Sequence, residues 1–220
     1  MSSVIIPNYT FDLHSYRRMV RWLRYMDKFI KPRLGYDKII MLDNASDLKF
    51  LKKLGCTVHS EDNSCLAIGR DDLFAYRYET HLPRTSMLGY SYFWRFISTI
   101  PKLKDTFYQA DKYYHIDSDN YIQTTELIDY MKNCNKGFVA FWEPNYNFPT
   151  SELFILNKDS ISQLSDYGIK RTGQMAEGVL PFTHIEKSFY GGRLPEFNLE
   201  GSQAHWLGQV TKHYKVRFRG

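Results

Sequence analysis

Short apolar runs alternate with segments of helical periodicity in the first 120 residues. The runs are mostly apolar, as expected of strands buried on both faces, and they cover residues 3–7, 38–42, 56–59 and 112–116. From Asp12, a residue type that caps helices, apolar positions recur at helical spacing to about Ile30. A second helix is expected over residues 46–54, closed by Gly55. The alternation predicts an α/β fold around a parallel sheet with right-handed crossovers.

The pattern is weaker in the rest of the chain. Residues 60–85 are polar and aromatic by turns, so we expect irregular structure or a mobile loop there. A helix is predicted from about Ser86 to Ile100, where Pro101 ends it. After the fourth apolar run, the pattern predicts a helix and then two strands, over residues 124–132, 137–142 and 151–156. Beyond Asp159 the chain is rich in glycine, and we expect mostly loops.

Length, charge and cysteine content narrow the class of protein. With 220 residues, of which 43% are hydrophobic, the chain suits one globular domain. The net charge is +5 and acidic residues are spread throughout, so no nucleic-acid partner is expected. The three cysteines include no C-x-x-C pair, so we expect neither a structural zinc site nor a disulfide framework. No segment resembles a signal peptide or a transmembrane span, and we expect a cytoplasmic protein.

The first predicted helix carries a stripe of basic residues opposite its apolar face, namely Arg17, Arg21, Arg24 and Lys28. We interpret the stripe as a solvated helix face. The alternative is contact with an anionic surface, which leaves peripheral membrane binding open.

The clearest candidate for a functional site is one motif with two carboxylates, Asp117-Ser118-Asp119, which directly follows the fourth apolar run. In open α/β sheets, ligands bind beyond the carboxyl ends of the strands. Two carboxylates at such a turn can converge on a hard cation, Mn²⁺ or Mg²⁺, which would bind nucleotide phosphates. An EF-hand is excluded because Tyr121, Ile122 and Ile128 stand where its loop needs an oxygen ligand, glycine and glutamate.

Three segments of the chain together resemble segments of a known enzyme family. These are Val4–Tyr9, Leu42–Asp47 and Ile116–Asn120. In their order and strand context they are similar to the opening strand, second strand end and metal motif of GT-A fold glycosyltransferases. The closest likeness is to the large inverting family 2. The resemblance implies one GT-A type domain, with a Rossmann-like β-α-β half and a mixed central sheet flanked by helices. Residues 1–120 would bind the nucleotide sugar and residues 121–220 the acceptor.

The resemblance also implies roles for individual residues. Asn8 and Tyr9 would border the nucleobase and ribose, and Asp43 would hydrogen-bond the uracil or ribose. Asp117 and Ser118 would contact the donor, and Asp117 and Asp119 would hold the metal. The implied donor is a UDP-sugar, and the implied acceptor is a glycan, glycoconjugate or other hydroxyl compound.

The remaining assignments lie where the chain departs from the family pattern. Among the arginines before the metal motif we favour Arg95 for the diphosphate, because its helix leads toward the metal strand; a structural arginine is the alternative. An inverting hexosyltransferase, which we favour over a retaining one, needs a carboxylate base. Glu200 is the first choice, although the second acid of the family's usual pair is missing beside it. The other candidates for the base are Glu177, Glu196 and Asp166.

His205 is a candidate third metal ligand, as a late histidine is in some enzymes of this fold. Trp142 and Glu143 are candidates for the acceptor site, because a ring beside a carboxylate suits a sugar. Two alternatives to the transferase stay open: a nucleotidyltransferase that makes nucleotide sugars, and an inactive carbohydrate-binding scaffold. A nucleotidyltransferase normally has a glycine-rich basic loop after its first strand, and residues 7–11 lack one.

Overall fold

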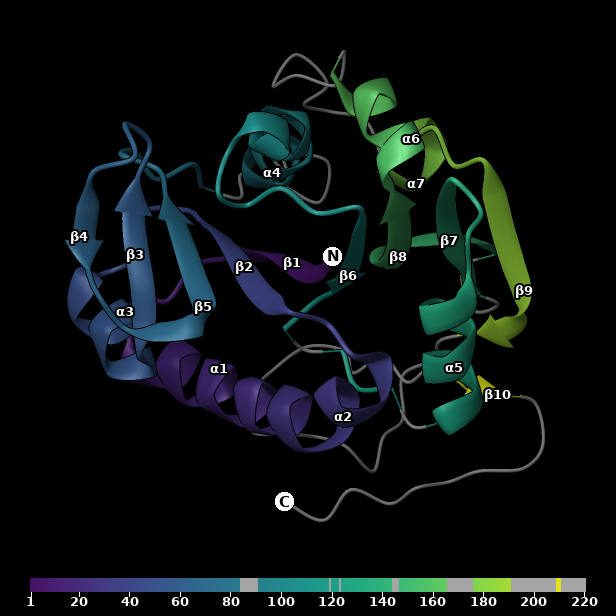
Figure 1. Ribbon diagram of the computed structural model, residues 1–220, viewed down its shortest axis with the longest axis horizontal. Helices are drawn as coiled ribbons and strands as arrows, with labels where there is room; N and C mark the ends of the chain where they lie inside the picture. Colours follow the sequence, from purple (N-terminus) through teal and green to yellow (C-terminus); the bar gives the residue numbers. More distant parts are fainter. Residues whose placement is uncertain are drawn as a thin grey trace.

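The computed structural model describes residues 1–83, 91–118, 120–122, 124–143, 147–165, 176–190 and 209–210. In these residues the chain forms one ten-stranded mixed sheet, in the order β10-β9-β7-β8-β6-β1-β2-β5-β3-β4. Helices α1, α2 and α5 cover one face of the sheet, and α4, α6 and α7 cover the other (Figure 1). The architecture is therefore α/β, with a mixed central sheet flanked by helices, as the sequence predicts.

The strands are β1 (Ser2–Asn8), β2 (Lys38–Asp43), β3 (Cys56–Ser60), β4 (Cys65–Ala67), β5 (Arg70–Arg77), β6 (Lys112–Ile116), β7 (Phe138–Glu143), β8 (Phe148–Asn157), β9 (His184–Tyr190) and β10 (Gln209–Val210). The α-helices are α1 (Leu13–Tyr25), α2 (Lys31–Leu34), α3 (Leu48–Leu54), α4 (Ser91–Thr99), α5 (Thr125–Asn133), α6 (Lys158–Ile161) and α7 (Ala176–Val179). A π-helix, η1 (Met26–Ile30), joins α1 to α2, and the 3₁₀ segments are η2 (Ile100–Asp105) and η3 (Ser162–Leu164). All four apolar runs of the first 120 residues are strands.

The centre of the sheet is parallel, and its strand order differs from the simplest prediction. β6, β1, β2, β5 and β3 run parallel, whereas β8 is antiparallel to both β6 and β7. The expectation of irregular structure over residues 60–85 is wrong, because β4 and β5 lie there and β5 separates β2 from β3. The first three residues of β5 are charged and only Leu73, Phe74 and Ala75 are buried, so the strand has too short an apolar run to be recognised.

The first helix begins as the sequence indicates and ends later. Asp12 accepts a hydrogen bond from the Ser15 amide at 2.7 Å and completes a capping box. The helix continues through η1 and α2 to Leu34, a turn beyond the predicted end, and Gly35 closes it with φ of 75°. This long helix is the crossover between β1 and β2, so its first turn lies near the carboxyl ends of those strands.

Alternate residues of the central strands fill two separate cores. Val4 and Ile6 of β1 face the core beneath α1 and α5, and Ile5 faces the core beneath α4. Trp22 anchors the first core and Trp94 the second, and both are fully buried. Burying a side chain of this kind stabilises the fold by roughly 2–3 kcal/mol.

The last third of the chain contains more regular structure than predicted. β9 pairs in parallel with β7, and β10 pairs with β9 in the antiparallel sense. The expectation of loops beyond Asp159 is wrong for these strands and for α6 and α7. No helix in the described residues is long and apolar enough to cross a membrane.

Candidate functional site

The strand order reverses at β1, which marks one edge of the sheet as a candidate binding site. The crossover through α1 takes the chain from β1 to β2 on one side, and β6 lies on the other side of β1. Ligands of open α/β sheets bind beyond the carboxyl ends of the strands at such a switch point. Because β1, β2, β5 and β6 are parallel, their last residues meet at this edge. Asn8, Asp43, Arg77 and Asp117 lie there.

A buried hydrogen-bond network joins the ends of β1 and β2. Asn8 is opposite Asp43 in the strand register, and its side-chain amide donates to Asp43 Oδ1 at 2.6 Å. The Ser46 hydroxyl donates to the same oxygen, and the Ser46 amide donates to Asp43 Oδ2 at 2.9 Å. The Ser46 oxygen in turn accepts from the Thr10 amide at 2.6 Å. The network therefore fixes the loop after β1 to the loop after β2.

Asp43 lies inside this network and is inaccessible to solvent. Burial raises the pKa of its carboxyl above the ordinary value, while the hydrogen bonds from Ser46 and Asn8 act in the opposite direction. The predicted contact of Asp43 with a base or ribose stays a prediction. In this arrangement both carboxylate oxygens already have donors within the protein, so Asp43 holds Asn8 in place.

Tyr9 stands at the centre of a three-ring stack beside the network. Its ring lies 4.1 Å from that of His81 and 4.8 Å from that of Phe11, with interplanar angles of 26° and 22°. The outer rings belong to exposed residues, and Phe11 is 54% exposed. Stacked rings of this kind offer an apolar face to a nucleobase, which is compatible with the role predicted for Tyr9.

Arg95 connects α4 to the loops after β2 and β5. Its guanidinium donates to the Thr80 carbonyl at 2.8 Å and to the Asn44 side chain, and it lies 3.9 Å from the centre of the Tyr78 ring. Arg95 is only 8% exposed. The predicted contact with a diphosphate is untested, and the interactions seen are those of a residue that positions the Asn44 loop.

Asp117 and Ser118 begin the turn after β6, beside the end of β1. The Asp117 carboxylate accepts the Ser118 amide at 3.2 Å, and the surrounding protein raises the pKa of the carboxyl to about 6. The positive charge of Arg18, from α1, favours the ionised form. Asn120 stabilises the turn through its side-chain amide, which donates to the Glu152 carbonyl at 2.9 Å, and its buried Oδ1 has no hydrogen-bond partner in the part of the chain that the structure describes. Unpartnered oxygen at this turn suits a hard cation.

His115, one strand position before Ile116, is a buried residue that the sequence motif does not distinguish. Its Nδ1 lies 2.9 Å from the Ile5 carbonyl, and its ring stacks on Phe154 at 4.4 Å. Burial lowers the pKa of His115 to about 4, so the ring is neutral at physiological pH. A neutral ring that donates to a backbone carbonyl of β1 fixes β6 against β1 below the candidate site.

Arg77 and Arg18 are basic residues at this edge that sequence reasoning missed. Arg77 ends β5 opposite Asp43, donates from Nε to the Ser46 carbonyl at 3.1 Å, and lies 4.0 Å from Asp43 Oδ2. It was missed because β5 was not recognised as a strand. Arg18 is next to Arg17 of the basic stripe, and only the packing of α1 on the sheet brings it near Asp117.

The predicted acceptor residues lie on another part of the sheet. Trp142 is in β7, half-buried, with Lys187 Nζ 4.4 Å above its ring. Glu143 ends the same strand, and its side chain lies outside the described residues. β8 and β6 separate β7 from β1, so the described residues place Trp142 away from Asn8 and Asp43.

Several predicted site residues fall outside the part of the chain that the structure describes. These are the metal ligand candidates Asp119 and His205 and the base candidates Glu200, Glu196 and Asp166, together with the side chain of Glu177. Within the described residues, no group of three or more histidine, cysteine, aspartate or glutamate side chains could hold a metal ion. A metal centre would therefore depend on Asp117 together with residues beyond the described ranges.

No protein-family model matches the sequence, and no curated protein matches it. Several solved structures resemble the fold. One is a glycosyltransferase involved in the glycosylation of the major capsid of PBCV-1, with 10% identity, coverage of 84% of this chain and 80% of that chain, and a TM-score of 0.44. HddC from Yersinia pseudotuberculosis has 13% identity, coverage of 86% and 89%, and a TM-score of 0.46.

A third similar structure is Rv0371C from Mycobacterium tuberculosis in complex with manganese, with 9% identity, coverage of 86% and 89%, and a TM-score of 0.43. At TM-scores below 0.5 these likenesses identify neither a family nor an activity.

Proposed function

We propose that this protein is a metal-dependent glycosyltransferase that takes a sugar from a nucleotide-sugar donor. The observation that carries the proposal is the switch-point edge, where Asn8, Tyr9 and Asp117 lie at the carboxyl ends of β1 and β6. The Tyr9 stack beside a polar, hydrogen-bonded strand end suits a nucleobase and ribose. UDP is the favoured nucleotide because the three segments resemble those of a glycosyltransferase family, and that resemblance implies a UDP-sugar donor.

The charged side chains at this edge support binding of a diphosphate. Arg77 ends β5, where its guanidinium donates to the Ser46 carbonyl and forms an ion pair with Asp43 at 4.0 Å, so its charge lies beside the strand ends. Arginine binds phosphate oxygens through two parallel hydrogen bonds. Arg77 is therefore a donor-binding candidate in addition to Arg95.

The residues at the β6 turn fit a divalent cation. Asp117 supplies a carboxylate with no cation in hydrogen-bond contact among the described residues, and Asn120 Oδ1 is a buried oxygen without a partner. In this proposal Asp117 and Asp119 hold Mn²⁺ or Mg²⁺, with His205 as a third ligand. The ion would neutralise charge on the departing diphosphate.

The acceptor side of the proposal depends on residues of the second half of the chain. Glu200 would take the proton of the acceptor hydroxyl in an inverting transfer. Trp142 and Glu143 would bind a glycan or glycoconjugate. Turnover that survives Glu200→Gln would exclude Glu200 as the base.

Calorimetric titration with UDP, GDP and CMP, each with and without Mn²⁺, tests the proposal. We expect UDP to bind only with the metal, and UDP-sugars to be turned over in the presence of an acceptor. Binding of a nucleoside triphosphate and a sugar phosphate, with release of pyrophosphate, would instead identify a nucleotidyltransferase. If no nucleotide binds under any condition, the transferase proposal fails.

A further inference from the structure

The outer face of the first helix carries cationic residues that the proposed function does not use. This basic stripe consists of Arg17, Arg21, Arg24 and Lys28, on α1 and η1. Arg17, Arg24 and Lys28 are exposed and Arg21 is half-buried. At a rise of about 1.5 Å per residue, the stripe extends over roughly 16 Å along one side of the helix.

Among the described residues, no carboxylate pairs with the charges of the basic stripe. None of the four residues forms an ion pair with a described residue, whereas Lys31, Arg33, Lys49 and Arg70 all do. The two carboxylates of this segment are occupied elsewhere. Asp12 accepts from Ser15 at the helix cap, and Asp27 binds Arg70 through two hydrogen bonds of 2.9 and 3.1 Å.

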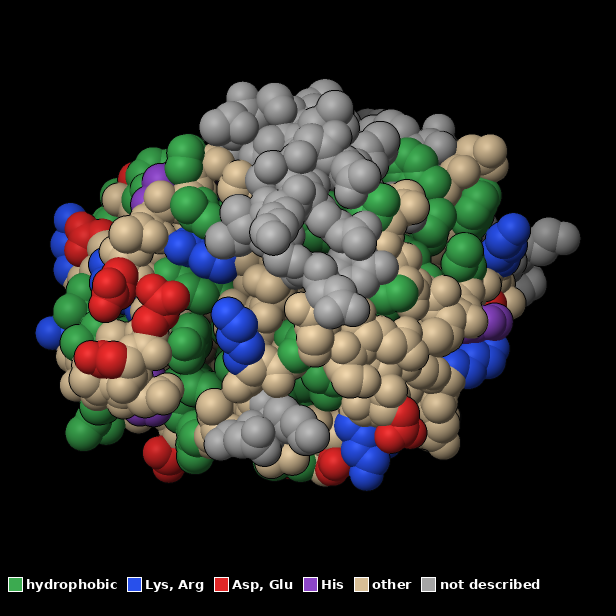
Figure 2. All heavy atoms as spheres, turned by 90° about the horizontal axis from the view of Figure 1, so that it is seen from above, with side chains coloured by type: hydrophobic (Ala, Val, Ile, Leu, Met, Phe, Trp, Pro, Cys, Tyr) green, Lys and Arg blue, Asp and Glu red, His purple; other side chains and the backbone are tan. Residues whose placement is uncertain are grey.

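Other surfaces of the molecule have a different distribution of charge. Figure 2 shows the molecule from the side opposite α1, and there acidic and basic side chains are interspersed at the end formed by β3, β4 and β5. Interspersed charge is the ordinary arrangement of a solvated surface, and a single-sign stripe favours an anionic partner.

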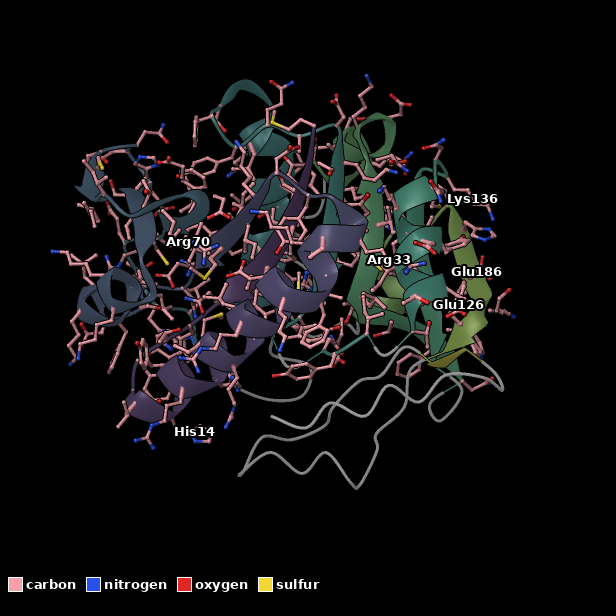
Figure 3. All side chains as sticks on the ribbon, turned by 60° about the horizontal axis from the view of Figure 1, so that its bottom comes forward. His14, Arg33, Arg70, Glu126, Lys136 and Glu186 are labelled. Carbon is pink, nitrogen blue, oxygen red and sulfur yellow. The ribbon has the colours of Figure 1, made fainter. Side chains whose placement is uncertain are left out.

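Large apolar side chains lie at both ends of the stripe. Phe11 and Leu13 are 54% and 52% exposed at the start of α1, and Phe29 is 38% exposed at the other end. His14, which follows Leu13, lies at the outer tip of the helix (Figure 3). Exposed Phe and Leu beside Arg and Lys are typical of helices that bind in the membrane interface. Phosphate contacts with nucleic acid require the cations and gain little from exposed Leu13.

We propose that the basic stripe, with Phe11, Leu13 and Phe29, binds the surface of an anionic lipid bilayer. The cations bind the lipid head groups, and the apolar side chains enter the boundary between head groups and acyl chains. None of the four stripe residues is assigned to the nucleotide site, whereas Phe11 is shared, because its ring also stacks on Tyr9.

Sedimentation of the full chain with lipid vesicles tests the proposal. The vesicles contain phosphatidylcholine alone or phosphatidylcholine with phosphatidylserine. The test variant is Arg17→Gln/Arg24→Gln/Lys28→Gln. The matched control is Lys102→Gln/Lys136→Gln/Lys158→Gln, which removes three exposed cations that are not on the first helix; Lys136 lies at the far end of the molecule from His14 (Figure 3). Thermal unfolding of both variants verifies that they are folded.

A basic residue close to an anionic membrane contributes about fivefold to the affinity, so the test variant is expected to bind roughly 100-fold more weakly. The control should bind the phosphatidylserine vesicles as the wild type does, and salt should weaken that binding. Leu13→Ser should weaken binding to the same vesicles even at high salt, because it removes an apolar contact. Equal loss in the test and control variants, equal binding to phosphatidylcholine alone, or stronger binding to duplex RNA than to vesicles would overturn the proposal.

Discussion

Replacing Ser46 with alanine removes the residue that joins the loops after β1 and β2. The Ser46 hydroxyl donates to Asp43 Oδ1, accepts from the Thr10 amide at 2.6 Å, and lies 3.3 Å from the Asn8 side-chain nitrogen. Ser46 and Thr10 are at most 1% exposed. Water therefore cannot replace the lost hydrogen bonds without local opening.

The expected cost follows from two of these contacts. A hydrogen bond to a charged group contributes about 1.5–3 kcal/mol, and a buried donor left without a partner costs about 1–3 kcal/mol. Asp43 keeps its bonds from Asn8 and from the Ser46 amide, which reduces the first contribution. We therefore expect Ser46→Ala to lower the free energy of unfolding by roughly 2–4 kcal/mol, which a typical domain survives.

Urea unfolding followed by circular dichroism measures this change. The control is Ser98→Ala, because the Ser98 hydroxyl donates only to the Arg95 carbonyl of its own helix, at 3.1 Å. We expect the control to change the free energy of unfolding by less than about 0.5 kcal/mol. A loss below about 1 kcal/mol for Ser46→Ala, or an equal loss in the control, would refute the account of the network.

Three further predictions concern single residues. Burial lowers the pKa of His115 to about 4 in the folded state. Between about pH 4 and 6.5 the unfolded chain therefore binds more protons at His115 than the folded protein does. The folded state is destabilised as the pH falls through that range. Between pH 7 and pH 5 the wild type should lose about 2 kcal/mol more stability than His115→Phe in urea titrations, and parallel losses would contradict the assignment. Asp12→Ala should lower the free energy of unfolding by about 1 kcal/mol through loss of the α1 cap, and an unchanged urea midpoint would exclude that role. If Arg95 positions the Asn44 loop, Arg95→Lys should lower the free energy of unfolding by at least as much as it lowers the free energy of nucleotide binding. A loss of nucleotide affinity in calorimetry with unchanged stability would instead indicate contact with the diphosphate.

The central strands could be predicted because each is marked by a short apolar run in the sequence, which indicates a buried strand. β1, β2 and β6 each contain a run of mostly apolar, buried residues, and Asp12 and Gly55 mark helix ends through preferences of single residues. β5 could not be predicted in this way. Its position between β2 and β3 depends on partners far away in the sequence, and ion pairs such as Arg70 with Asp27 satisfy its charged beginning.

The candidate site could be predicted only in part, for the same reason. Asn8, Asp43 and Asp117 follow recognisable strands, so the sequence brings them to one edge. The burial of Asp43 could not be foreseen, because it results from Ser46 folding back over the strand end. Arg77 and Arg18 approach the site only through the sheet order and the packing of α1.

We propose that a nucleotide and a divalent cation bind at the carboxyl ends of β1 and β6. The most direct test is calorimetric titration of UDP with Mn²⁺ into the wild type, Asp117→Asn and Asp159→Asn. Asp159 is an exposed carboxylate of α6, which follows β8 at the opposite edge of the sheet. The account predicts that Asp117→Asn binds at least about tenfold more weakly and that Asp159→Asn binds as the wild type does. Equal affinity in all three proteins would contradict it.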